Sequence, residues 1–169
     1  NGGAIYVKGE DTDILHSSFN DCVSKGAYSG GAIYINDKDT TVAYSNFTSC
    51  EAKVAGAIYI NGINTLISYC NLDNNTALGY EAKFAAGGAI KVFGNNTIIS
   101  NCNFTNNTAL HGSGGALDMG GDNASVYYSW FDRNYAEYNG GAINWDGGHG
   151  SDSIIGSTFT NNKCNYDQQ

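Results

Sequence analysis

One short motif recurs six times in this sequence. GGAI, or a close variant of it, begins at intervals of 25 to 32 residues, at Gly2, Gly30, Ala55, Gly87, Gly114 and Gly140. An apolar residue stands 17 residues after each start, or 19 in the last repeat: Phe19, Phe47, Leu72, Phe104, Phe131 and Phe159. Length therefore varies mainly after this second anchor, where we expect loops. Repetition at this period is typical of a solenoid.

Within each repeat the apolar residues alternate with period two, as in a half-buried β-strand. The first strand supplies an aliphatic column made of Ile5, Ile33, Ile58, Ile90, Leu117 and Ile143. A second strand supplies Ile14, Val42, Ile67, Ile99, Val126 and Ile154, and a step of three to the next small residue predicts a corner. With 23 glycines and no proline, long helices are disfavoured. We predict one all-β domain over residues 1–169, a parallel β-helix of about six coils with two or three short strands each.

Two further columns have structural roles in such a stack. The glycine pair is expected at a turn or close approach where no side chain fits. Three residues after the aromatic anchor stand Cys22, Cys50, Asn75, Asn107, Asn134 and Asn162. The asparagines are expected to hydrogen-bond from coil to coil as a buried ladder. Cys22 and Cys50 are interpreted as small buried thiols at the same position, with a disulfide between them as the alternative.

The combination of GGA[IL] with F-x-x-N resembles a known repeat. The second element stands at Phe104–Asn107, Phe131–Asn134 and Phe159–Asn162, with Leu72–Asn75 as a variant. Together the two elements resemble the repeat of the chlamydial polymorphic outer-membrane proteins, which also occurs in adhesin-like surface proteins of methanogenic archaea and bacteria. The resemblance covers the whole chain and implies a right-handed, single-stranded parallel β-helix in a secreted or cell-surface protein associated with adhesion. It carries no catalytic site.

Charge and composition argue against several function classes. The net charge of −8 disfavours a nucleic-acid partner. No apolar run approaches the roughly 18 residues needed to cross a bilayer, so no membrane insertion is expected within this segment. A polysaccharide lyase or hydrolase remains an alternative, but the single arginine, Arg133, lies in a turn, and the outward-facing Asp118 and Asp146 are out of register on adjacent repeats.

We expect neither a metal ion nor a cofactor. The histidines His16, His111 and His149 show no metal-ligand spacing. Acidic residues gather in the first two repeats, at Glu10, Asp11, Asp13, Asp37 and Asp39. A solvated acidic face is the simpler interpretation of that cluster, and a Ca²⁺ site is the alternative.

Outward-facing tyrosines are the candidate ligand-binding residues. Tyr6, Tyr34 and Tyr59 share one position on three successive repeats, and Tyr44 and Tyr69 share another. Rows of rings suit contacts with glycan or protein, although stacking that merely stabilises a sheet surface is the alternative. The longest connection, residues 76–86, adds Tyr80 as a candidate on a loop.

Glycosylation sequons are frequent in this asparagine-rich chain. They begin at Asn46, Asn74, Asn95, Asn103, Asn106 and Asn123. Taken together, the sequence predicts a non-catalytic, adhesin-like module that presents loops and an aromatic flank to a surface glycan or protein ligand. The alternative is a structural subunit of an extracellular filament or sheath that assembles head to tail, because an open β-helix leaves unpaired strand edges.

Overall fold

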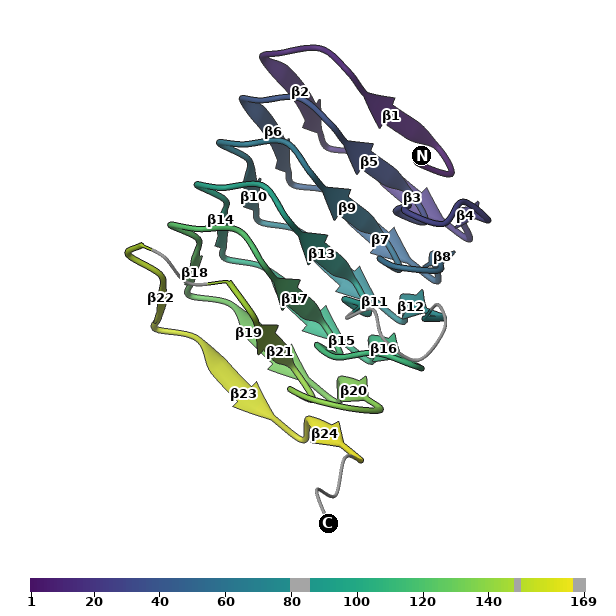
Figure 1. Ribbon diagram of the computed structural model, residues 1–169, viewed down its shortest axis with the longest axis vertical. Helices are drawn as coiled ribbons and strands as arrows, with labels where there is room; N and C mark the ends of the chain where they lie inside the picture. The colour runs from purple at the N-terminus through teal and green to yellow at the C-terminus, as the bar shows by residue number, and fades with distance from the viewer. Residues whose placement is uncertain (80–85, 148–149, 166–169) are drawn as a thin grey trace.

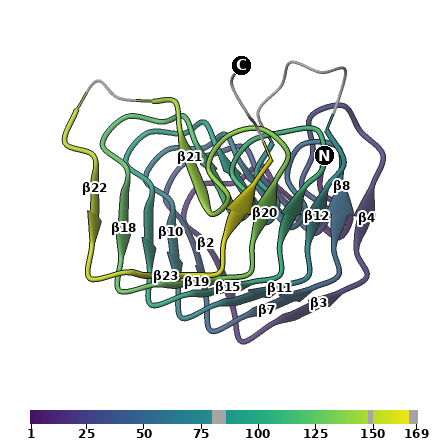
Figure 2. The ribbon, with the colours of Figure 1, turned by 90° about the horizontal axis from the view of Figure 1, so that it is seen from below.

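The computed structural model is an all-β solenoid (Figure 1). It describes residues 1–79, 86–147 and 150–165, and every regular element in these ranges is a short β-strand. Each coil contributes one strand to each of four parallel sheets, which we call walls 1 to 4. Seen along the axis, the coils lie over one another (Figure 2). The predicted parallel β-helix is therefore confirmed, with four strands per coil where two or three were expected.

Each wall has six strands, which stack in chain order. Wall 1 contains β1 (Ile5–Val7), β5 (Ile33–Ile35), β9 (Ile58–Ile60), β13 (Ile90–Val92), β17 (Leu117–Met119) and β21 (Ile143–Trp145). Wall 2 contains β2 (Thr12–Leu15), β6 (Thr40–Ala43), β10 (Leu66–Ser68), β14 (Ile98–Ser100), β18 (Ser125–Tyr127) and β22 (Ser153–Ile155). Between the first and last strand of a wall the chain makes about five turns, close to the six coils predicted.

Walls 3 and 4 complete the coil. Wall 3 contains β3 (Ser18–Asn20), β7 (Asn46–Thr48), β11 (Asn71–Asp73), β15 (Asn103–Thr105), β19 (Trp130–Asp132) and β23 (Thr158–Thr160). Wall 4 contains the two-residue strands β4 (Val23–Ser24), β8 (Glu51–Ala52), β12 (Thr76–Ala77), β16 (Thr108–Ala109), β20 (Tyr135–Ala136) and β24 (Lys163–Cys164). Among the described residues no helix is present, and hence none that could cross a membrane.

The register places like residues on like residues. Ile5 pairs with Ile33, Ile33 with Ile58, and the column continues through Ile90. Its members from the second to the fifth coil are fully buried and belong to one core that runs the length of the tube. The Phe47, Phe104 and Phe131 rings of wall 3 are also fully buried, and Phe104 stacks on Phe131 at 4.8 Å between centroids. The predicted inward columns are therefore present, but their members Ile154 and Phe159 are exposed, because no further coil covers them in this structure.

In each of the first five coils, three corners contain a residue in the left-handed backbone region, and the described part of the sixth coil has two of them, at Gly156 and Asn161. The predicted corner between walls 2 and 3 is one of these three corners, with Tyr44, Tyr69 and Tyr128 among its residues. The other two columns consist mainly of Asp and Asn, which adopt this conformation more readily than most residues. They are Asp11, Asp39, Asn64, Asn96 and Asn123 before wall 2, and Asp21, Ser49, Asn74, Asn106, Arg133 and Asn161 after wall 3. The high asparagine content is thus partly a consequence of corner geometry.

The second glycine of each pair lies against the next coil. A Cβ at Gly3, Gly31, Gly56, Gly88 or Gly115 would overlap the carbonyl oxygen of the corresponding glycine one coil further on. The first position of the pair is occupied by alanine in the third coil, where Ala55 forms bridges to Gly30 and Gly87. The expectation of a close approach is therefore confirmed, and the second column explains why glycine occupies it in all six repeats.

The asparagine ladder forms as predicted. The Oδ1 atom of Asn107 accepts hydrogen bonds from the backbone N–H and the Nδ2 of Asn75, each at 3.0 Å. Its own Nδ2 donates to Asn134 Oδ1 at 3.0 Å and to the Leu72 carbonyl at 2.9 Å. Asn162 continues the ladder, since its Oδ1 accepts from Asn134. Each buried amide thereby satisfies polar groups on two coils.

Four of the five cysteines fill ladder positions as free thiols, and the fifth, Cys164, is an exposed free thiol in β24. Cys50 is buried, its backbone N–H donates to Asn75 Oδ1 at 3.0 Å, and burial raises the pKa of its thiol to about 12. Cys22, on the first coil, is free as well, so the alternative disulfide is not present, but Cys22 is only partly buried and the expected burial holds for Cys50 alone. Cys70 and Cys102 stand in a second buried column with serines, where Cys102 N–H donates to Ser129 Oγ at 3.2 Å. Sequence reasoning had not identified that column as a hydrogen-bond ladder.

Substitution of Gly88 by alanine tests the contact between coils. The new methyl group would overlap backbone on the neighbouring coil, so we expect Gly88→Ala to lower the free energy of unfolding by roughly 3 kcal/mol or more, or to prevent folding. Gly9→Ala is the matched control, because the nearest atom to its Cβ would be Thr12 Oγ1 at 3.8 Å. Urea unfolding followed by circular dichroism measures both. Equal stability of the two variants would contradict the packing described.

Replacement of Asn107 tests the buried ladder. Asn107→Ala removes four hydrogen bonds and leaves buried groups without partners, so we expect a loss of about 3 to 5 kcal/mol in the free energy of unfolding. Asn103→Ala, in the same coil, removes an exposed amide that donates to Asn71 Oδ1 and should cost less than about 1 kcal/mol. A comparable loss in both variants in chemical denaturation would show that burial of the ladder is unimportant.

Candidate functional site

The predicted tyrosines form two rows on the outside of the tube. The wall row lies on the outer face of wall 1 and contains Tyr6, Tyr34 and Tyr59. The corner row lies between walls 2 and 3 and consists of His16, Tyr44, Tyr69, Asn101, Tyr128 and Gly156. Tyr80 falls outside the described residues. Both rows are stacked along the axis, as the repeat predicts.

The wall row is exposed at only one end. Its rings stack at 5.3 Å between Tyr6 and Tyr34 and at 4.9 Å between Tyr34 and Tyr59. Tyr6 is 48% exposed, but Tyr59 is only 5% exposed because it packs against Val54 and Ala55. This burial raises the pKa of the Tyr59 phenol. The expectation that Tyr59 offers an exposed ring is therefore wrong, since the chain before the glycine pair covers it.

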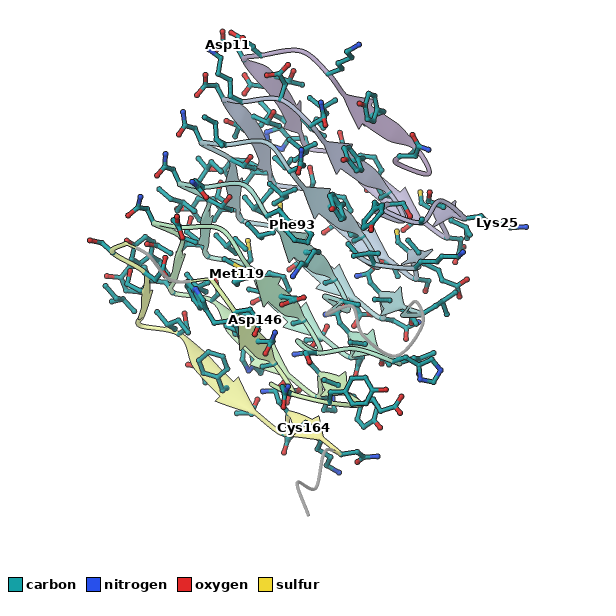
Figure 3. The ribbon with its side chains drawn as sticks, in the orientation of Figure 1. Asp11, Lys25, Phe93, Met119, Asp146 and Cys164 are labelled. Carbon is teal, nitrogen blue, oxygen red and sulfur yellow. The ribbon has the colours of Figure 1, made fainter. Side chains whose placement is uncertain are left out.

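Beyond Tyr59 the wall row becomes polar. Lys91 pairs in register with Tyr59 and with Asp118, and Asp118 pairs with Asn144. Lys91 Nζ lies 2.6 Å from Asp118 Oδ2, and its ammonium group lies 4.5 Å from the centroid of the Phe93 ring. Figure 3 labels Phe93, on the fourth coil, and Asp146, which lies two coils further along the rod. The row thus changes from stacked rings to a cation and a carboxylate.

Asp118 was expected to face outward together with Asp146, and the structure agrees only in part. It does point away from the tube core, but it is fully buried. Asn144 Nδ2 donates to Asp118 Oδ1 and to Asp146 Oδ2, each at 2.9 Å, so one amide bridges the two carboxylates. Burial raises the pKa of Asp118, while Lys91 and then Asn144 act in the opposite direction. Sequence reasoning found both acids but missed Lys91 and Asn144.

The corner row is exposed and conformationally costly. Tyr44 and Tyr69 have φ of 52°, and Tyr128 has φ of 47°. A non-glycine residue in this region costs about 1–2 kcal/mol, and a large ring has none of the local hydrogen bonding that helps Asn. Nevertheless Tyr44 and Tyr69 are each 52% exposed and Tyr128 is 65% exposed. Strained, exposed aromatic residues are more typical of a functional surface than of a structural corner.

One coil interrupts the corner row. His16, Tyr44 and Tyr69 stack at 5.0 and 4.9 Å with nearly parallel planes. The next coil has Asn101, whose exposed side chain contributes no ring. The Tyr128 ring, in turn, occupies the space that a Cβ at Gly156 would need, so it leans toward the last coil. Among the described residues Tyr69 therefore has a ring partner on one side only, Tyr44. We call the resulting gap in the row of rings, at Asn101 between Tyr69 and Tyr128, the opening.

Exposed amides and an indole lie beside this opening. The first residues of the wall 3 strands form an outer ladder in which Asn71 donates to Asn46 at 2.9 Å and Asn103 donates to Asn71 at 2.8 Å. Trp130 takes the same column on the next coil, is 47% exposed and donates from Nε1 to Thr160 Oγ1 at 3.1 Å. Its position in the asparagine column could have identified it from sequence.

The glycosylation candidates all lie on the surface. Asn46, Asn74, Asn95, Asn103, Asn106 and Asn123 are exposed. Asn74, Asn106 and Asn123 occupy left-handed corners. Whether any of them carries a glycan stays a prediction.

No metal centre is formed by the described part of the chain. No group of three His, Cys, Asp or Glu side chains in it is arranged to hold an ion. His16 and His111 are exposed and lie apart, and His149 is outside the described residues. In the acidic cluster Lys38 pairs with Glu10 at 3.1 Å, as on a solvated surface.

No known protein family, curated protein or solved structure matches this chain.

The two rows are expected to respond differently to truncation. Tyr59→Ala should lower the free energy of unfolding by about 3–5 kcal/mol, because a buried aromatic side chain is lost. Tyr69→Ala should cost only about 0.5–1.5 kcal/mol for one stacking contact. Thermal and urea unfolding of the two variants measure the difference. A larger loss for Tyr69→Ala would contradict the burial assigned to the wall row.

Proposed function

We propose that this chain is a non-catalytic, adhesin-like module of a cell-surface or secreted protein, and that its corner row binds a surface glycan. The observation that carries the proposal is the opening between Tyr69 and Tyr128. Their positions in the row stand two coils apart, about 10 Å, which is the spacing at which one further ring would stack between them. A pyranose ring has apolar faces that stack on aromatic side chains and hydroxyl groups that bind polar ones.

The surroundings of the opening fit a neutral sugar. Asn101 at its floor and Asn103 beside it are exposed amides, which both donate and accept hydrogen bonds. Tyr44 and Tyr69 brace each other by stacking, so little conformational entropy is lost when a ligand binds. A binding role would also explain why tyrosine stands at this corner despite its conformational cost. Asparagine or glycine would be sufficient if the residue only had to form the turn.

The arrangement of the acids supports a non-catalytic role. Asp118 is buried and ion-paired with Lys91, so it does not face a ligand on the surface. Asp132 is buried too, and it accepts hydrogen bonds from Thr160 and Asn161 and pairs with Arg133 at 2.9 Å. Glycoside hydrolysis requires two carboxyl groups facing one substrate, an arrangement that these side chains do not offer.

Filling the opening is the sharpest test. Asn101→Tyr adds the ring that the row lacks, so we expect glycan binding to fall at least tenfold while the fold is retained. Asn96→Tyr is the matched control, because it places tyrosine in a left-handed position of the same coil at a different corner. Binding of the whole chain is measured on a glycan array and then by calorimetry with the glycans that bind.

Removal of the flanking rings gives the complementary result. Tyr69→Ala with Tyr128→Ala should abolish the same binding, whereas Tyr6→Ala should leave it unchanged. Glycan binding that survives in Asn101→Tyr, or an unmodified chain that binds no glycan on the array, would overturn the proposal.

A further inference from the structure

Lys91 and Asp118, the buried ion pair of the wall row, have features of an amine and a carboxyl group that react with each other. Lys91 and Asp118 are directly opposite each other on adjacent parallel strands, β13 and β17. Their side chains are 5% and 0% exposed, and Nζ lies 2.6 Å from Oδ2. A charged pair this deeply buried loses its hydration, and the remaining attraction compensates for that loss only with difficulty. Transfer of one proton from Nζ to Oδ2 within the short hydrogen bond gives a neutral amine and a neutral acid.

Two aromatic rings and a glycine lie beside the pair. Lys91 Nζ faces the Phe93 ring, and Phe93 in turn lies 5.6 Å from the Tyr59 ring, centroid to centroid. Gly120 lies alongside, since a Cβ on it would be 3.8 Å from Lys91 Nζ. The neutral amine is a nucleophile, and it is held in contact with a carboxyl group whose pKa burial raises.

The other oxygen of Asp118 is held separately. Asn144 Nδ2 donates to Oδ1, on the opposite side of the carboxyl group from Lys91. An N–H donor at this position stabilises the negative charge that develops on an acyl oxygen during nucleophilic attack. Asp146, bridged through the same amide, orients Asn144. One oxygen is therefore placed to become an oxyanion and the other to leave.

We propose that Lys91 and Asp118 condense to an intramolecular isopeptide bond that links the fourth coil to the fifth. The lone pair of the neutral Nζ attacks Asp118 Cγ, and the C–O π electrons move to Oδ1, where Asn144 donates. A proton from the attacking nitrogen passes to Oδ2, which already carries the proton received from Nζ. The electrons on Oδ1 then re-form the C=O bond, the Cγ–Oδ2 bond breaks, and Oδ2 leaves as water. The products are one amide and one water molecule, and two opposite charges disappear. No oxidant, reductant or metal ion takes part.

A second ion pair in the same protein provides the contrast. Lys38 lies 3.1 Å from Glu10, but these side chains are 43% and 56% exposed. Water solvates both charges there, so the amine stays protonated and does not attack. The reaction is thus assigned to Lys91 from burial, register and the donor on Oδ1 together, and not from proximity alone.

Mass spectrometry of the whole chain under denaturing conditions tests the bond. We expect an intact mass one water molecule below that of the sequence. Trypsin should also fail to cleave after Lys91, which gives one peptide covering residues 84–133 with the same deficit and with fragment ions that place the link between Lys91 and Asp118. A full sequence mass, together with cleavage after Lys91, would overturn the proposal.

Variants separate the cross-link from other dehydrations. Lys91→Met with Asp118→Leu replaces both partners by apolar side chains, which avoids an unpaired buried charge, and should restore the full mass expected for that variant. Lys8→Met, at an exposed lysine, should retain the deficit. Succinimide formation at the Asp146–Gly147 sequence would also release water, but it would persist in the double variant. A deficit that persists there would therefore refute the cross-link.

Discussion

The whole structure depends on one constraint, which is that each residue stands one strand spacing from its counterpart on the next coil. Only side chains that can stack on themselves, or on a complementary group, are compatible with it. Amides satisfy it by donating on one side and accepting on the other, as Asn75, Asn107 and Asn134 do. Aromatic rings satisfy it by stacking, and glycine satisfies it where backbone meets backbone. The sequence repeats because this constraint applies to every coil.

Most of the fold could be predicted because the constraint acts on every repeat. Residue spacing predicts the inward columns that contain Ile33 and Phe47. It also predicts the buried amides and the corner before wall 3. The strands of wall 4 could not be predicted in this way. A strand such as Val23–Ser24 has two residues, which is too short to show an alternation. Its pairing is set by the walls on either side, so it cannot be predicted from the residues of the strand itself.

Exposure was the property that spacing predicted least well. The alternation of apolar residues shows whether a side chain points into the tube. A side chain that points outward can still be buried by another part of the chain. Tyr59 and Asp118 both point out and are both buried. Val54 and Ala55 pack against Tyr59, and Lys91 and Asn144 lie against the Asp118 carboxylate. The corner tyrosines project where two walls meet, and there the outward direction and solvent coincide. The corner row is consequently the better candidate surface, although both rows look alike in sequence.

Both proposals concern places where a column changes its residue type. In the corner row an amide replaces the aromatic ring at Asn101. In the wall row an ion pair replaces the rings, beginning at Lys91, and both changes occur on the fourth coil. The opening proposed for a ligand is bounded by Tyr128 on the fifth coil, and the Lys91 to Asp118 bond would join the fourth coil to the fifth. A covalent tie between those coils would hold the opening at one width before a ligand arrives. Binding would then cost less ordering, which is the advantage of a preorganised site.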